Sequence, residues 1–180
     1  IARKPGLANG RTAGGIYQDF VRQVTELPKF NAKSKCMIAL AFITPRVDSP
    51  MESKTRIATT KYGLPPAVTN YTVPGATFSN GAPITLDLAW PEFRVAIEYD
   101  GDHHRTDKNQ WRRDNDKREL LRHHHWIVII ATAANMADEP SQAELAYRVG
   151  RQLALRGAVF DFTLTATPLD ELARRRRRRI

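Results

Sequence analysis

The sequence predicts an α/β fold in which a mixed central sheet is flanked by helices. Two segments, residues 83–90 and 93–100, show the period-2 hydrophobic alternation of strands. Residues 126–130 are apolar and rich in β-branched side chains, which is typical of a strand in the buried or parallel part of a sheet. Segments with helical periodicity lie before, between and after these strands, at residues 49–63, 105–124 and 141–156. The predicted order is helix, three-stranded meander, helix, strand and helix.

Residues 1–48 form an N-terminal segment without recognisable chemistry. The first fifteen residues are rich in glycine and basic residues, which favours disorder. Residues 16–27 carry apolar side chains at the spacing of an amphipathic helix, and residues 37–42 are an apolar run compatible with a helix or a strand. We therefore expect the segment to be partly disordered and leave it unassigned.

The first helix after this segment has a well-marked start. Ser49 is a good N-cap, Pro50 suits the first helical position, and Glu52 lies in the first turn, where the helix dipole favours an acid. The helix is expected to end near Gly63. Residues 67–73 then alternate weakly in hydrophobicity and predict the first strand of the meander.

The next two strands are expected to pair as a hairpin. Ile84, Leu86 and Leu88 alternate with polar or small residues, so they are expected to share one face of their strand. Pro91 interrupts the run, because proline has no amide hydrogen to donate to a strand ladder and favours a turn. The chain then resumes as a mostly apolar strand.

Three acidic residues are expected to converge on this hairpin. Period 2 places Glu98 and Asp100 on one face, about 7 Å apart, and pairing brings Asp87 close to them. Such carboxylates repel one another, and more strongly where water is scarce. The cation that neutralises them is either a neighbouring Lys or Arg side chain or an oxygen-ligated divalent metal ion such as Mg²⁺. Together with His104, three residues after Gly101, the acids predict a phosphodiester-cleaving centre.

Residues 105–124 are expected to form a long, highly charged helix in which basic residues outnumber acidic ones. Two interpretations are open: a solvated surface helix, or a wall that faces substrate phosphates. Its position directly after the acidic strand favours the second. Gln110 and Arg113 are then candidates for contact with substrate phosphates.

Residues 158–180 are expected to form a basic C-terminal tail. Phe160, Phe162 and Leu164 alternate and suggest an edge strand before it. The chain carries a formal net charge of +9, which favours a polyanionic partner, but the six arginines at 174–179 supply most of it. This run is either a solvated end or a sequence-independent grip on phosphate.

Composition narrows the class of protein further. A length of 180 residues with 42% hydrophobic content suits one soluble domain with a core. The sequence contains no apolar stretch long enough to span a membrane and no signal-peptide pattern at its start. A single cysteine, Cys36, excludes an internal disulfide framework and a cysteine-based zinc site. We expect a cytoplasmic protein without membrane association, and no feature indicates its oligomeric state.

The acidic hairpin resembles the core of the restriction-endonuclease-like PD-(D/E)XK superfamily. The matching residues are Asp87, ten intervening residues, and residues 98–104, which read Glu-Tyr-Asp-Gly-Asp-His-His. The pattern is most similar to the uncharacterised bacterial branch related to very-short-patch-repair endonucleases, whose signature runs Asp…Glu-x-Asp-Gly-x-x-His. Residues 49–53 and 125–128 resemble the same branch. The resemblance covers about residues 49–157, which we treat as an endonuclease-like domain.

The resemblance implies a DNA-repair type of enzyme, a metal-dependent endonuclease that hydrolyses phosphodiester bonds in DNA with Mg²⁺ or Mn²⁺. It implies that Asp87 and Glu98 ligate the metal ion, together with the backbone carbonyl of Tyr99 and with help from Asp100. Where the superfamily motif has a lysine, this chain has Asp100. The role of that lysine therefore has no counterpart at this position.

The resemblance gives two further residues a role. His104 would orient the attacking water or protonate the leaving oxygen, and Glu52 would be an outer ligand, although helix capping by itself also explains Glu52. The alternative is a non-catalytic nucleic-acid-binding module of the same fold. A third interpretation is an interaction protein in which the acids pair with arginines of the long helix. Dependence on a divalent metal ion separates the enzyme from the other two.

Overall fold

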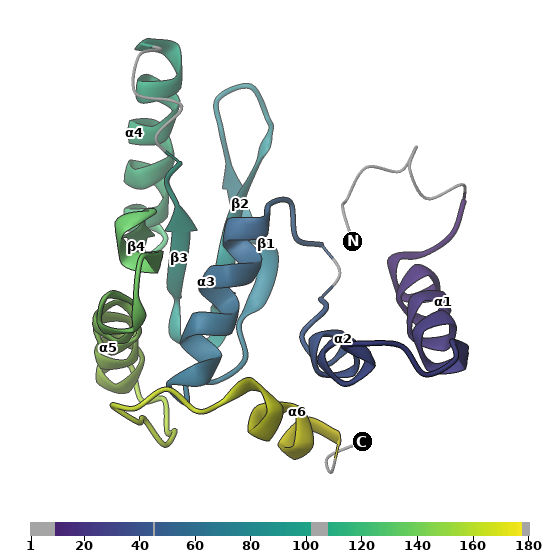
Figure 1. The fold of residues 1–180 in the computed structure, drawn as a ribbon. Coiled ribbons are helices and arrows are strands. Elements are labelled where there is room, and N and C mark those ends of the chain that lie inside the picture. Colours follow the sequence, from purple (N-terminus) through teal and green to yellow (C-terminus); the bar gives the residue numbers. More distant parts are fainter. Residues whose placement is uncertain (1–9, 45, 102–107, 178–180) are drawn as a thin grey trace.

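A four-stranded mixed sheet forms the centre of the molecule (Figure 1). The computed structural model describes residues 10–44, 46–101 and 108–177, with side chains except at 108–111, 176 and 177. The sheet has the order β1-β2-β3-β4, in which β1, β2 and β3 form an antiparallel meander and β4 runs parallel to β3. The strands are β1 (Val68–Thr77), β2 (Pro83–Trp90), β3 (Val95–Tyr99) and β4 (Ile127–Ala131). The predicted α/β class and the mixed sheet are confirmed.

Helices cover both faces of the sheet. The described helices are α1 (Ala13–Glu26), α2 (Lys33–Leu40), α3 (Pro50–Lys61), α4 (Lys108–His123), α5 (Glu139–Leu155) and α6 (Leu169–Arg177). Helices α3 and α5 pack with the sheet in one core cluster, and α4 packs in the other. Helix α4 and the β1–β2 hairpin extend toward the same end of the molecule, the top of Figure 1. No helix in the described part of the chain is long and apolar enough to cross a bilayer.

The capping chemistry predicted for α3 is present. The hydroxyl of Ser49 accepts a hydrogen bond from the amide of Glu52 at 3.1 Å, and Pro50 is the first helical residue. Helix α5 begins slightly earlier than predicted, because the side chain of Asp138 accepts a hydrogen bond from the amide of Ser141 at 2.8 Å and caps the helix. These local contacts set where both helices begin.

The two faces of β3 separate as its alternation predicts. Val95 and Ile97 are fully buried in the cluster that also contains residues of α3 and α5. Ala96, between them, is buried in the cluster that contains Leu121 of α4. Glu98 follows Ala96 at period 2 and therefore lies on the α4 side of the sheet.

One prediction for β2 is wrong. Leu88 packs in the α3–α5 cluster, whereas Ile84 and Leu86 pack in the α4 cluster, so the three side chains do not share a face. The side chains change face at Asp87. This residue lies opposite Asn70, between the pairs Thr69–Leu88 and Tyr71–Leu86 of the β1–β2 ladder. Asn70 has a positive φ of 47°, which interrupts the regular extended backbone at this point of the ladder.

The predicted edge strand at 160–164 is also wrong. Phe160 and Phe162 pack onto the core cluster instead, and their rings lie within 3.5 Å of where a Cβ on Gly150 of α5 would stand. The amide of Thr163 donates a hydrogen bond to the carbonyl of Tyr62 at 3.1 Å, so the segment is tied to the end of α3. The alternation of aromatic residues here reflects packing against a helix.

Two segments that the sequence left open are helical. Residues 33–40 form α2, which overlaps the ambiguous apolar run. Helix α6 forms within the basic tail, where Arg174 pairs with Asp170 at 2.7 Å and Arg175 pairs with Glu171 at 2.6 Å. These acids lie one turn before the arginines, a spacing that offsets the charge of the run and supports a helix.

Candidate functional site

Asp87 of β2 and Glu98 of β3 lie opposite each other on neighbouring strands. The pairing of Leu88 with Ile97 fixes this register, since Asp87 and Glu98 are the next residues along each strand. The amide of Tyr99 donates a hydrogen bond to Oδ2 of Asp87 at 2.8 Å. The hairpin therefore brings the two carboxylates together and orients one of them through the backbone.

Glu98 has an unusual environment for a carboxylate. Its side chain is 19% exposed, Oε2 accepts a hydrogen bond from Nζ of Lys117 at 2.5 Å, and buried Oε1 has no hydrogen-bond partner among the described residues. Burial raises the pKa of Glu98 to about 7, and the negative charge of Asp87 adds to this rise, while the Lys117 ammonium opposes it. Near neutral pH this carboxyl group exists in both protonation states.

A polar cavity of about 250 Å³ surrounds these groups. Four elements supply its walls: the middle of β2, the end of β3 with the two residues after it, one face of α4, and β4. The residues that line it are Asp87, Glu98, Tyr99, Asp100, Gly101, Asp114, Lys117, Arg118, Leu121, Val128 and Ile130. Four residues predicted to belong to the site, Asp87, Glu98, Tyr99 and Asp100, are therefore brought together at one cavity.

Glu52 lies at the start of α3 and is not part of that lining. Its Oε2 accepts hydrogen bonds from the amide of Asp48 at 3.1 Å and from Nδ2 of Asn70 at 3.3 Å. Burial raises the pKa of Glu52, and the charge of Asp87 contributes to this rise. The carboxylate thus joins the residue before the N-cap to β1, rather than the N-cap amide itself, and it is close enough to Asp87 to be affected by its charge.

The remaining predicted residues are not brought to the cavity by described contacts. His104 lies outside the described residues, and Gln110 lies in α4 with its side chain outside them. Arg113 is exposed on α4 and does not line the cavity; its guanidinium carbon is 5.4 Å from the centre of the Phe78 ring in the β1–β2 turn. Arg113 thus lies beside the turn of the β1–β2 hairpin.

Sequence reasoning missed Lys117, which it counted only as one basic residue of a charged helix. A usable signal was present in the spacing. Leu121 lies one turn after Lys117 on the same face of α4, and a leucine in a charged helix marks the side that meets the sheet. Leu121 is 1% exposed, so Lys117 is directed toward the acidic strands.

The chemistry of the donors fits a hard divalent cation. Asp87 and Glu98 provide carboxylate oxygens, the ligand type that Mg²⁺ and Mn²⁺ favour, and Oε1 of Glu98 is an acceptor without a donor among the described residues. Within the ranges that the structure describes, no group of three or more His, Cys, Asp or Glu side chains is arranged to hold a metal ion. A cation here would take its remaining ligands from water or backbone oxygens.

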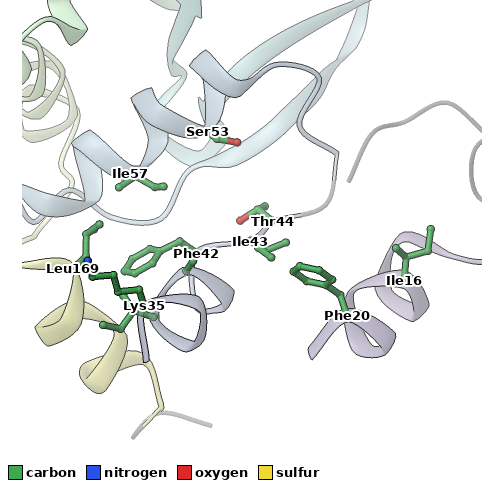
Figure 2. Close-up of a pocket in the computed structure, with 11 residues that line it drawn as sticks. Ile16, Phe20, Lys35, Phe42, Ile43, Thr44, Ser53, Ile57 and Leu169 are labelled. Atoms are coloured by element: carbon green, nitrogen blue, oxygen red, sulfur yellow. The ribbon is translucent and has the colours of Figure 1, made fainter. Parts of the chain in front are cut away.

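A larger cavity lies elsewhere. It has a volume of about 710 Å³ and is lined by residues of α1, α2 and α3, by residues 42–44 and by the start of α6. Figure 2 shows Phe20, Phe42, Ile57 and Leu169 gathered around it, with Lys35 as the charged side chain of its lining. Its lining, as far as the chain is described, has no acidic or histidine side chain that could ligate a cation or transfer a proton. We therefore place the candidate site at the smaller acidic cavity.

Comparison with known proteins gives relatives without an assigned activity. The chain is 29% identical over 114 residues to "Uncharacterized protein Rv2248" of Mycobacterium tuberculosis (strain ATCC 25618 / H37Rv). It matches "Uncharacterized protein MT2308" of Mycobacterium tuberculosis (strain CDC 1551 / Oshkosh) to the same extent. The match covers 63% of this chain and 40% of each relative, so the chain spans well under half of their length. No family model and no solved structure matches the chain.

Proposed function

We propose that this chain is a metal-dependent endonuclease that hydrolyses phosphodiester bonds in DNA. The observation that carries the proposal is the pairing of Asp87 with Glu98 across the hairpin, in a polar cavity bordered by a helix rich in cations. Carboxylates held side by side at partial burial are unfavourable for folding, because they repel each other and lose water. A bound cation would offset the repulsion between the two carboxylates, which explains why the fold holds them together.

Asp87 and Glu98 would hold Mg²⁺ or Mn²⁺, with the Tyr99 carbonyl as a further ligand. When bound, the ion would stabilise the charge that develops on the scissile phosphate. The chain's own groups prepare the site: the Tyr99 amide fixes the orientation of the Asp87 carboxylate, and the hairpin fixes its distance from Glu98. Asp100 extends the acidic wall of the cavity.

Other predicted residues keep the roles that the resemblance implies. His104 would orient the attacking water or donate a proton to the leaving oxygen, and Glu52 would act as an outer acid next to Asp87. Arg113 and Gln110, on the helix that borders the cavity, would contact phosphates of the substrate. We propose DNA as the partner and the cytoplasm as the location of this activity.

One observation favours a second candidate, a nucleic-acid-binding module without catalysis. Lys117 already neutralises Glu98 at 2.5 Å, which is the ion pair that a non-catalytic acid would need. In that case the acidic cavity has a structural role, and binding of nucleic acid depends on the exposed basic surface alone.

The test is cleavage of supercoiled plasmid and of mismatched duplex DNA with Mg²⁺ or Mn²⁺. We expect metal-dependent nicking by the wild type and a loss of about 100-fold or more in Glu98→Gln, which corresponds to about 2.7 kcal/mol of transition-state stabilisation. Glu92→Gln is the matched control, because Glu92 is exposed on the same hairpin. DNA binding that persists without cleavage in any metal would favour the binding module, and absence of both would overturn both candidates.

A further inference from the structure

The acidic cavity contains a partly buried cation–carboxylate contact that the motif does not account for. Nζ of Lys117 lies 2.5 Å from Oε2 of Glu98, and the two side chains are 20% and 19% exposed. The lysine comes from α4 and the glutamate from β3, so the contact joins elements of different secondary structure. Both residues line the same cavity.

The contact divides the two oxygens of Glu98 into different roles. Oε2 is held by the Lys117 ammonium, whereas Oε1 is buried and has no donor in the described part of the chain. A carboxylate fixed at one oxygen loses rotational freedom about its terminal torsion, which is otherwise broad. The other oxygen is then presented in a defined direction as an acceptor.

The lysine is itself held in place. Leu121, one turn further along α4, is buried in the core cluster with Ala96 of β3, so this face of the helix is fixed against the sheet. Asp114 and Arg118 border the cavity on the same part of the helix. The position of the ammonium is therefore set by packing of the helix onto the strand that carries Glu98.

We propose that Lys117 is a positioning residue of the metal site, which anchors Oε2 of Glu98 so that Oε1 can ligate a divalent cation. This inference rests on the proposed function, since it needs Glu98 to be a ligand. Groups that hold a metal ligand from behind commonly affect metal affinity by 10- to 100-fold. The competing role is that of a simple counter-ion that occupies Glu98 until a metal ion displaces it.

The two roles predict opposite changes in metal affinity. In Lys117→Met the positioning role predicts Mn²⁺ binding about 10- to 100-fold weaker than in the wild type. The counter-ion role predicts tighter binding, because a competing positive charge is removed. Lys117→Arg keeps a charged donor and is expected to restore most of the affinity. The control is Arg122→Met, which removes an exposed positive charge from the same helix.

The experiment is titration of the intact chain with Mn²⁺, followed by calorimetry and by the electron paramagnetic resonance signal of free Mn²⁺, without DNA. Weaker binding in Lys117→Met with rescue in Lys117→Arg supports the proposal; unchanged or tighter binding overturns it while leaving the metal site intact. If the wild type binds no Mn²⁺, or Glu98→Gln binds it equally well, the proposed metal site itself fails. Lys117→Gln replaces Lys117→Met in the comparison if the latter does not fold.

Discussion

The amide that follows Glu98 in β3 holds the carboxylate that faces Glu98 from β2: the Tyr99 N–H donates to Oδ2 of Asp87 at 2.8 Å. The ladder that pairs the strands thus also places two acids against each other. Strand pairing contributes to folding across the whole hairpin, so it can hold one unfavourable pair in place. Unfavourable electrostatics supported by a regular scaffold are typical of functional sites.

The pair should respond to neutralisation of either member. We expect Asp87→Asn to lower the pKa of Glu98 from about 7 toward its ordinary value, because the substitution removes a nearby negative charge. The pKa should remain elevated, since burial is the larger cause. The measurement is an NMR titration of the Glu98 side-chain carboxyl carbon. Asp100→Asn is the control, because Asp100 lines the cavity without contributing to the shift; an equal decrease in both variants would contradict this account.

The raised pKa of Glu98 also makes stability depend on pH. Between the ordinary value of 4.5 and about 7, the unfolded chain ionises at this residue while the folded chain stays protonated. The contribution of Glu98 to the free energy of unfolding is therefore most favourable below pH 4.5. It decreases as the pH rises through this window and does not change further above it. We expect the wild type to lose free energy of unfolding relative to Glu98→Gln from pH 5 to pH 7, by at most about 1.4 kcal/mol per pH unit.

Urea denaturation of both proteins at several pH values measures this difference. Glu92→Gln is the matched control, because the exposed Glu92 should leave the pH profile parallel to that of the wild type. A difference between wild type and Glu98→Gln that stays constant across the window would show that Glu98 is ionised at pH 5 in the folded state.

Local chemistry made part of this fold predictable. Ser49 and Pro50 predicted the start of α3 because capping depends on adjacent residues alone. Asp87, Glu98 and Asp100 were predicted to converge because period 2 and hairpin pairing are short-range rules. Both successes use contacts within or between neighbouring elements.

The features that could not be predicted from the sequence depend on contacts between elements that are distant along the chain. The change of face between Leu86 and Leu88 coincides with a positive φ at Asn70 on the neighbouring strand, and hydrophobic alternation encodes neither. The position of Lys117 depends on which side of α4 meets the sheet, and only one turn of leucine packing marks that side. Phe160 and Phe162 have the alternation of a strand, yet the space above Gly150 determines where they lie.

The segment after α5 packs closely against Gly63, which follows α3. A Cβ at this glycine would stand 2.0 Å from the carbonyl oxygen of Asp161, and its φ is +85°. We expect Gly63→Ala to lower the free energy of unfolding by roughly 2–4 kcal/mol, because left-handed strain and a backbone clash add together. Gly157→Ala is the control with a similar φ of +91° but nothing within 4 Å of its Cβ, and it should cost only about 1–2 kcal/mol. Equal losses, measured by urea denaturation, would mean that the clash relaxes without cost.

Arg113 provides a test of the predicted phosphate-facing wall. It is exposed on α4 and its guanidinium lies against Phe78, so the charge is held beside the hairpin, on the helix that also lines the acidic cavity. If this surface grips DNA, Arg113→Met should weaken binding and reduce the slope of log K against log salt concentration by about 0.9, the value for one lost phosphate contact. Arg151→Met removes an exposed arginine from α5, on the opposite face of the sheet, and should leave the slope unchanged. Fluorescence anisotropy of a labelled duplex over a series of salt concentrations measures both. Equal slopes for the two variants would mean that binding depends on net charge, as expected for a basic tail, and that α4 does not form the substrate wall.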